Sequence, residues 1–156
     1  MNVFMDSDTI SEKTLEKLET FSQNFLSHLW IRRKNPIYIS IEIEEQGDVD
    51  DAVAYCMQSD DDACEIGIAS HIFDDEDYLF ETLAHELVHV KQYVKGELKQ
   101  NTRGTIWKGE EQMPLISLCS ALGVELTEEM YKSQPWEEEA YRLQALYKKF
   151  LWLEIL

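Results

Sequence analysis

The feature that most constrains this chain is a pair of histidines set one helical turn apart, in the segment His85-Glu86-Leu87-Val88-His89. Apolar residues around the segment recur at helical spacing and predict one buried stripe, so the two histidines fall on a second, mostly polar face. The stripe comprises Leu79, Phe80, Leu83, Ala84, Leu87, Val88 and Val94, and the polar face comprises Tyr78, His85, His89 and Gln92. Side chains four residues apart on a helix lie roughly 5–6 Å from each other. Two imidazoles at that separation can bind one Zn²⁺ ion at about 2.0–2.1 Å.

Glu86 supplies the second part of the pattern. It follows His85 directly and lies about 100° further around the helix, so it cannot be a ligand in the same plane. It can instead reach a water molecule at the open position of the metal and act as a general base. The spacing resembles the HExxH motif of zinc metallopeptidases, which implies Zn²⁺ as the cofactor, His85 and His89 as ligands, and hydrolysis as the chemistry. Two histidines that merely share a helix face are the alternative, which does not explain a carboxylate flanked by buried aliphatic residues.

A third metal ligand has to come from elsewhere in the chain, because a catalytic zinc ion generally takes three protein ligands and leaves one position for water. Positions 92 and 95 are glutamine and lysine, which excludes the extended motif with a third histidine. His28 is expected at the edge of the core, and His71 is a minor ligand candidate between a strand and a loop. The better candidate segment is Pro135-Trp136-Glu137-Glu138-Glu139-Ala140-Tyr141, because a proline followed by acidic residues predicts a helix start.

This segment resembles the gluzincin branch of the zincins, the thermolysin-like peptidases, whose third ligand is a glutamate in a Glu-x-x-Ser/Ala pattern on a later helix. The pattern matches residues 137–140, so the resemblance implies Glu137 as the third ligand, with Glu138 and Glu139 as alternatives. Tyr141 stands where these families usually have an aspartate. In size the chain is most similar to minigluzincins and small SprT-like proteins, but it lacks the cysteine-rich zinc ribbon. A solvated helix start that complements the helix dipole is the alternative interpretation of each glutamate alone.

The resemblance implies a zinc-dependent metallopeptidase that acts on a peptide or protein substrate, with Glu86 as the general base. A hydrogen-bond donor to the oxyanion is also required. Tyr141 is the catalytic candidate for this role, and Tyr131 and Arg142 are the other nearby candidates in the sequence. Two other functions fit the same residues. One is a catalytically silent zincin-like module that binds partners through its acidic surface, as an adaptor would. The other is a zinc hydrolase with a non-peptide substrate.

The charge of the chain restricts its partners. Its formal net charge is −17 at pH 7 and its pI is near 4.5. Such a charge repels phosphate backbones and anionic lipid surfaces, so neither nucleic acid nor a membrane is an expected partner, whereas cationic peptides are compatible with it. The acidic clusters lack the alternating ligands, central glycine and closing glutamate of a calcium loop, so they predict solvated loops. They are Asp48–Asp51, Asp60–Asp62 and Asp74–Asp77.

Length, cysteine content and the N-terminal sequence predict a single cytoplasmic domain over residues 1–156. The three cysteines have neither the even count nor the spacing of a disulfide framework, which indicates reduced thiols. A Cys56–Cys64 pairing across adjacent strands is the less favoured alternative. The first residues show neither a basic region nor a long apolar stretch, so no secretory signal is predicted. No apolar run approaches the length of a transmembrane helix. The sequence does not predict an oligomeric state.

The periodicities along the chain predict an α+β fold with the element order of a zincin: a first helix, a mainly three-stranded sheet, the HExxH helix and a C-terminal helix with the third ligand. The glycine after each of two helices is expected to end it, Gly96 for the HExxH helix and Gly123 for a short one. By analogy with zincins, Glu65-Ile66-Gly67-Ile68 is expected to be an edge strand that pairs with an extended substrate. Helices are expected at 8–30, 115–122 and 136–153, and strands at 37–43, 53–57 and 64–69.

Overall fold

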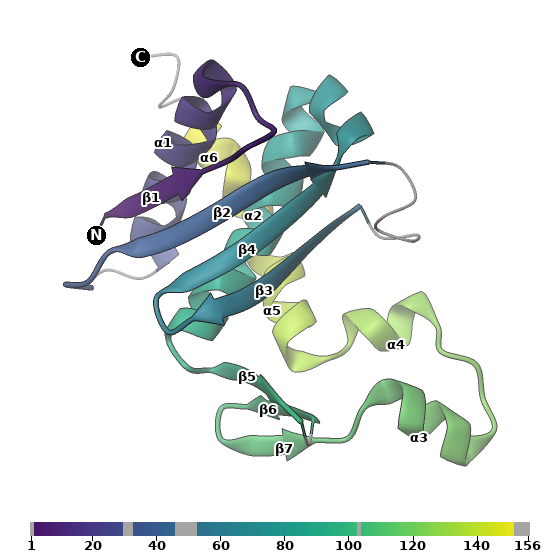
Figure 1. The fold of residues 1–156 in the computed structure, drawn as a ribbon. Helices are drawn as coiled ribbons and strands as arrows, with labels where there is room; N and C mark the ends of the chain where they lie inside the picture. The colour runs from purple at the N-terminus through teal and green to yellow at the C-terminus, as the bar shows by residue number, and fades with distance from the viewer. Residues whose placement is uncertain (1, 30–32, 46–52, 103, 152–156) are drawn as a thin grey trace.

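Four short segments form a mixed sheet in the computed structural model, which describes residues 2–29, 33–45, 53–102 and 104–151. Strands β1 (Val3–Asp6), β2 (Ile37–Glu44), β4 (Ala63–Ala69) and β3 (Ala54–Asp60) lie side by side in that order (Figure 1). β2 pairs in parallel with both β1 and β4, whereas β3 pairs antiparallel with β4. The two edges of the sheet are therefore β1 and β3.

One face of the sheet is covered by helices α1 (Glu12–Leu29) and α2 (Glu76–Val94), which lie on the same side of it in Figure 1. Four isoleucines of β2 and β4 point into this layer and are at most 1% exposed: Ile39, Ile41, Ile66 and Ile68. The ring of Phe21 packs 5.7 Å from that of Phe25 and 4.8 Å from that of Phe80, so aromatic contacts join α1 to α2. Burying each such side chain stabilises the fold by roughly 1.5–3 kcal/mol.

Both ends of α2 are defined by local sequence. The Asp75 side chain accepts a hydrogen bond from the backbone N–H of Tyr78 at 3.2 Å, which caps the N-terminus, and acidic residues follow in the first turn. At the other end Gly96 has φ 76°, and the N–H of Glu97 donates to the carbonyl of Gln92 at 2.8 Å. Only glycine adopts that backbone conformation without strain, so the predicted role of Gly96 at the helix end is confirmed.

The remaining elements form a smaller sheet and a series of short helices. β5 (Leu98–Asn101), β6 (Gly104–Trp107) and β7 (Glu110–Gln112) make an antiparallel three-stranded sheet. It is followed by α3 (Leu115–Leu122), α4 (Glu128–Lys132), α5 (Pro135–Gln144), the 3₁₀ helix η2 (Ala145–Tyr147) and α6 (Lys148–Leu151). α5 packs against α2, and Ala140 in this contact is fully buried. The short 3₁₀ helix η1 (Ser70–Asp74) connects β4 to α2.

The α+β class is confirmed, and the helix at 115–122 ends as predicted at Gly123, which has φ 68°. Other boundaries differ. The first helix begins at Glu12, where Ser11 Oγ accepts from the N–H of Thr14 at 3.4 Å, rather than near residue 8. The last predicted helix is divided into α5, η2 and α6. Residues 30, 152 and 153 of the predicted helices lie outside the described residues.

Two predictions about the sheet were wrong. The main sheet has four strands rather than three, because β1 adds to β2 in parallel. The predicted edge segment 65–68 belongs to β4, which is paired on both sides. The two strands differ in composition as their positions require. β4 is mostly buried and apolar, as a central strand should be, whereas β3 ends in exposed polar residues that suit an edge. None of the helices in the described ranges is long and apolar enough to cross a membrane.

Candidate metal centre and cleft

The contact between α2 and α5 brings two histidines and one glutamate together. His85 and His89 lie one turn apart on α2, and Glu137 lies in the first turn of α5, which begins at Pro135. The Nε2 atom of His85 is 3.0 Å from Glu137 Oε2, and the Nε2 atom of His89 is 3.0 Å from Glu137 Oε1. The three ligand atoms all lie within 4.8 Å of one another. Among the described residues, this is the one group of three or more histidine, cysteine or acidic side chains that could hold a metal ion.

The alternative third ligands lie elsewhere. Glu138 is exposed, and Glu139 points to Lys91, whose Nζ is 2.8 Å from its Oε1 atom. His71 is exposed in η1. His28 is exposed as well, with its ring 5.3 Å from the ring of Phe150. The geometry therefore places only Glu137 of these candidates beside the two histidines, and its role as a metal ligand stays a prediction.

Each histidine is oriented by a glutamine on its other ring nitrogen. His85 Nδ1 lies 2.7 Å from Gln144 Oε1, and His89 Nδ1 lies 2.8 Å from Gln92 Oε1. The glutamine amides are held in turn, because Gln92 Nε2 donates to the Trp136 carbonyl at 2.9 Å and Gln144 Nε2 donates to Glu81 at 3.2 Å. An amide oxygen only accepts, so each Nδ1 carries a proton. In the neutral imidazole, the Nε2 lone pair then faces Glu137, as a metal ligand requires.

These two glutamines are functional candidates that the sequence reasoning missed. Gln92 was placed on the polar face of the helix without a role, and Gln144 was not considered. The available signal was spacing, because Gln92 follows His89 by three residues and Gln144 follows Glu137 by seven. Both spacings put the two members of a pair on one helix face. No local sequence pattern indicates that Gln144 contacts His85, because the two residues are 59 positions apart in the chain.

The donor set fits Zn²⁺ in chemistry and in spacing. Two imidazole nitrogens and one carboxylate are a ligand combination of catalytic zinc sites, which leave a fourth position open. Ligand atoms bound to one zinc ion at about 2.0–2.1 Å lie roughly 3.3 Å apart when the geometry is tetrahedral. Glu137 Oε2 lies 3.0 Å from His85 and Glu137 Oε1 lies 3.0 Å from His89, so each pair taken separately is close to that value. Glu137 and His89 are both buried, and both line the cleft, so water and substrate would reach the group from the cleft.

In the metal-free protein, the ligand group has the electrostatics of an ion pair. Burial alone would raise the pKa of Glu137, but hydrogen bonds from His85 and His89 outweigh it and lower the pKa to about 2. Burial alone would lower the pKa of His89, but the hydrogen bond to Glu137 and the charge of Glu86 raise it to about 9. The buried carboxylate thus stays ionised over the whole physiological range.

Glu86 lies beside this group on the cleft-facing side of α2 and is only 6% exposed. Burial raises its pKa, although the nearby His89 and His85 oppose the shift. None of the salt bridges among the described residues involves Glu86. A buried carboxylate with a raised pKa and no salt-bridge partner has the properties of a general base.

Two of the three candidate oxyanion donors face the cleft. The Tyr131 hydroxyl donates to Glu137 Oε1 at 3.1 Å, which leaves it close to the ligand group. The ring of Tyr141 packs 4.6 Å from the ring of His85 and is 38% exposed. Arg142 is exposed and is not among the residues that line the cleft. Burial and the charge of Glu137 raise the pKa of both tyrosines, so each keeps its hydroxyl proton and can donate it in a hydrogen bond.

The cleft itself has a volume of about 620 Å³. Its lining residues come mainly from α2, the edge strand β3, α4 and α5. A residue pair of β5, Leu98 and Gln100, completes the lining. This volume is in the range of sites that bind small molecules or short peptide segments.

Comparison with protein-family models, curated proteins and solved structures found no match for this chain. The likeness to gluzincins therefore rests on the motif and on the residues around it.

Proposed function

We propose that the chain is a zinc-dependent metallopeptidase of zincin-like fold, in which His85, His89 and Glu137 hold Zn²⁺. The observation that carries the proposal is the paired orientation of the two histidines. Both turn Nε2 toward the same buried carboxylate while a glutamine oxygen holds each Nδ1 atom. A metal site needs such second-shell partners, whereas two histidines that share a helix face by chance do not.

Glu86 is the proposed general base. Zn²⁺, when bound, supplies the Lewis acidity that polarises a scissile carbonyl and lowers the pKa of water. Glu86 accepts a proton from the attacking water and later delivers it to the leaving amine. Tyr141 is the proposed donor to the oxyanion, because it lines the cleft and makes none of the hydrogen bonds to the proposed ligands among the described residues. The Tyr131 hydroxyl is instead engaged with Glu137 and positions that ligand.

Substrate recognition by strand addition is assigned to β3 in this proposal. One edge of β3 pairs with β4, and residues 53–56 along the strand line the cleft. An extended peptide can add to the other edge through backbone hydrogen bonds, with its scissile bond directed toward α2. β3 thus takes the role first expected of segment 65–68. The backbone of that segment is already paired with β2 on one side and with β3 on the other.

The test is zinc stoichiometry on protein purified without a metal-binding tag. We expect one zinc ion per chain in the wild type, and loss of that zinc in His89→Ala and Glu137→Ala. Glu138→Ala is the matched control, because Glu138 lies in the same helical turn but is exposed. Loss of zinc in the control to the same extent would contradict the assignment of Glu137. A wild type that holds no zinc, even after metal is added back, would favour the acidic binding module.

A further inference from the structure

Ten of the 19 described residues that line the cleft are acidic or aromatic. Four of them are glutamates, and none of the described lining residues is lysine or arginine. Five are tyrosines, of which Tyr78 and Tyr141 are 42% and 38% exposed. Carboxylates and exposed aromatic faces both attract cations. We propose that the cleft selects peptides that place an arginine or lysine side chain beside Glu81, one helical turn before His85. This substrate class rests on the proposed peptidase function.

Glu81 is positioned to hold such a side chain. It lies four residues before His85 on α2, so the two side chains share a helix face, and Tyr78 lies three residues earlier on that face. Its carboxylate accepts from Gln144 Nε2 at 3.2 Å and also contacts the Tyr147 hydroxyl. A carboxylate has about four acceptor positions, so these neutral donors leave room for a cation. No salt bridge among the described residues neutralises Glu81.

The basic groups of the cleft lie beside carboxylates other than Glu81, since His85 and His89 each lie 3.0 Å from Glu137. Glu128 is paired with Lys132 at 3.0 Å, and the Lys132 ammonium lies 4.9 Å from the centre of the Tyr141 ring, so this pair contributes little net charge. Glu81, Glu86 and Glu137 remain. Glu81 is not one of the proposed metal ligands and has no salt-bridge partner among the described residues, so a bound metal ion does not take up its charge directly. The net charge of −17 on the whole chain adds a long-range attraction for cationic peptides.

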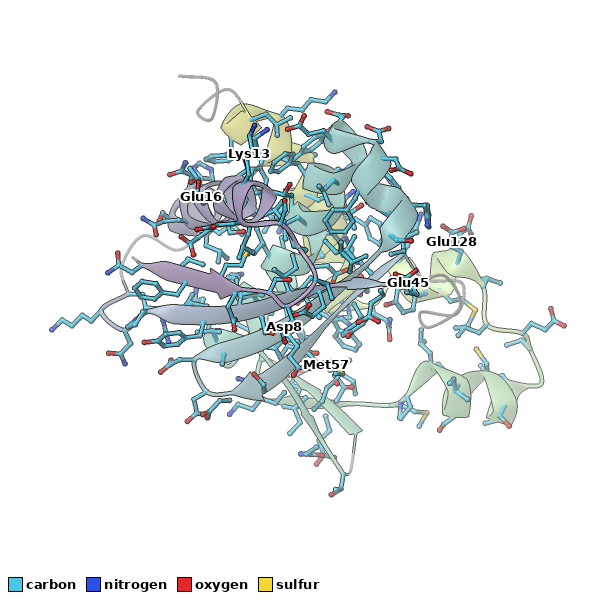
Figure 2. The ribbon with its side chains drawn as sticks, turned by 45° about the horizontal axis from the view of Figure 1, so that its top comes forward. Asp8, Lys13, Glu16, Glu45, Met57 and Glu128 are labelled. Atoms are coloured by element: carbon cyan, nitrogen blue, oxygen red, sulfur yellow. The ribbon has the colours of Figure 1, made fainter. Side chains whose placement is uncertain are left out.

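The experiment compares three dye-labelled peptides that differ at one position, which is arginine, norleucine or glutamate. Binding to the metal-free protein is measured by fluorescence anisotropy at low and high salt, and cleavage by the zinc-loaded protein is measured as kcat/KM. The variants are Glu81→Gln, Glu81→Lys and the control Glu16→Gln. Glu16 is an exposed residue of α1, and Figure 2 shows it far from Glu128 at the cleft. Both glutamine variants change the total charge equally, and thermal melts verify that each variant folds.

We expect the arginine peptide to bind and to be cleaved roughly tenfold better than the glutamate peptide. Glu81→Gln should reduce this preference to within about twofold, Glu81→Lys should reverse it, and Glu16→Gln should retain it. Equal binding of the three peptides would overturn the proposal, as would a preference that Glu81→Lys leaves unchanged. Equal losses in Glu81→Gln and Glu16→Gln would overturn it too, because total charge alone would then explain the preference. A preference in binding without any cleavage would support the cation site while contradicting the peptidase function.

Discussion

The two buried faces of α2 differ in how they are held. Toward α1 and the sheet, the helix buries Phe80, Leu83 and Leu87, each at most 1% exposed, and these contacts are apolar. Toward α5 and the cleft it buries Glu86, His89 and Gln92. His89 and Gln92 are hydrogen-bonded to each other and are ion-paired or hydrogen-bonded to α5. The stability of the first face depends on close packing, that is, on the volume and shape of its apolar side chains. The second loses free energy with each polar group left without a partner. One face of α2 therefore stabilises the fold, and the opposite face carries the residues of the candidate site.

This division has a mechanical consequence for the site. A polar cluster without other support would lose its geometry when one member moved. His85 and His89 instead belong to α2, whose opposite face is packed in the hydrophobic core. α5 completes the cluster from one side only, and the fully buried Ala140 lets it approach α2 closely. The site is thus preorganised by packing on the apolar face and by hydrogen bonds on the polar face. Substitutions on the two faces should have separable effects.

The largest effect is expected from Glu86→Gln, on the polar face. The amide keeps the size of the side chain but cannot accept a proton, so hydrolysis should fall about a thousandfold. Zinc content should be unchanged, because Glu86 is not among the proposed ligands. The melting temperature should not fall, because the neutral amide replaces a buried carboxyl whose pKa is raised by burial. The measurements are kcat/KM on a fluorogenic peptide and metal analysis of the same sample. Activity that persists in clean protein would rule out Glu86 as the general base. The polar face of α2 would then not carry the catalytic role that is proposed for it.

Leu83→Ala tests the opposite face. The side chain is fully buried, so its truncation should lower the free energy of unfolding by about 3 kcal/mol. The folded fraction should still bind one zinc ion per chain. Leu122→Ala is the matched control, because Leu122 is 64% exposed and its truncation should cost less than about 0.5 kcal/mol. Denaturant titration measures both changes. A loss of zinc from folded Leu83→Ala protein would show that the two faces are not separable.

The sequence predicted the elements whose signals are local. The apolar stripe of α2 and the left-handed glycines Gly96 and Gly123 could be recognised within a few residues. β1 has only four residues, and its stability comes from pairing with β2, more than thirty residues away, so no local pattern marked it. The edge of the sheet was misplaced for the same reason, because the pairing of β4 with β2 is non-local.

The site shows the same limit. The two histidines and Glu86 form a motif within five residues, so their shared face was predictable from helix geometry. The choice of Glu137 over Glu138 and Glu139 came from a resemblance, and the structure adds the reason for its position. Glu137 faces α2 in the first turn of α5, whereas its neighbours point to solvent or to Lys91. Helical spacing places Gln92 near His89, but the pairing of Gln144 with His85 depends on the packing of α5 against α2, which no spacing rule identifies.

Gln144→Ala should produce an intermediate effect on the polar face. It removes the acceptor for His85 Nδ1, so the ring loses its fixed orientation and tautomer. Affinity for zinc should fall about 10–100-fold, as is usual when a second-shell partner is removed. Competition with a chromophoric chelator measures the change. Gln100→Ala is the control, because Gln100 lines the same cleft but is exposed and does not hydrogen-bond to either histidine among the described residues. Unchanged affinity in Gln144→Ala would mean that packing alone orients the histidine.

The smallest effect is expected from Glu42→Gln, in a polar cluster on β2 that is remote from both faces of α2. Partial burial alone would raise the pKa of Glu42, but hydrogen bonds from Thr9, Asp8 and Ser7 outweigh it and lower the pKa. A carboxylate whose pKa is lower in the folded state stabilises the fold above its ordinary pKa of 4.5, and this contribution is lost as the pH falls through the folded-state value.

The glutamine variant should therefore cost about 1 kcal/mol at pH 7, and the difference from wild type should shrink on acidification below about pH 4.5. Thermal melts of both proteins between pH 3 and pH 7 measure it. Zinc content at pH 7 should be equal in the two proteins, because these hydrogen bonds join β2 to the segment before α1 and do not reach the cleft. A change in zinc content would mean that polar networks throughout the fold support the metal centre, and not only the network between α2 and α5.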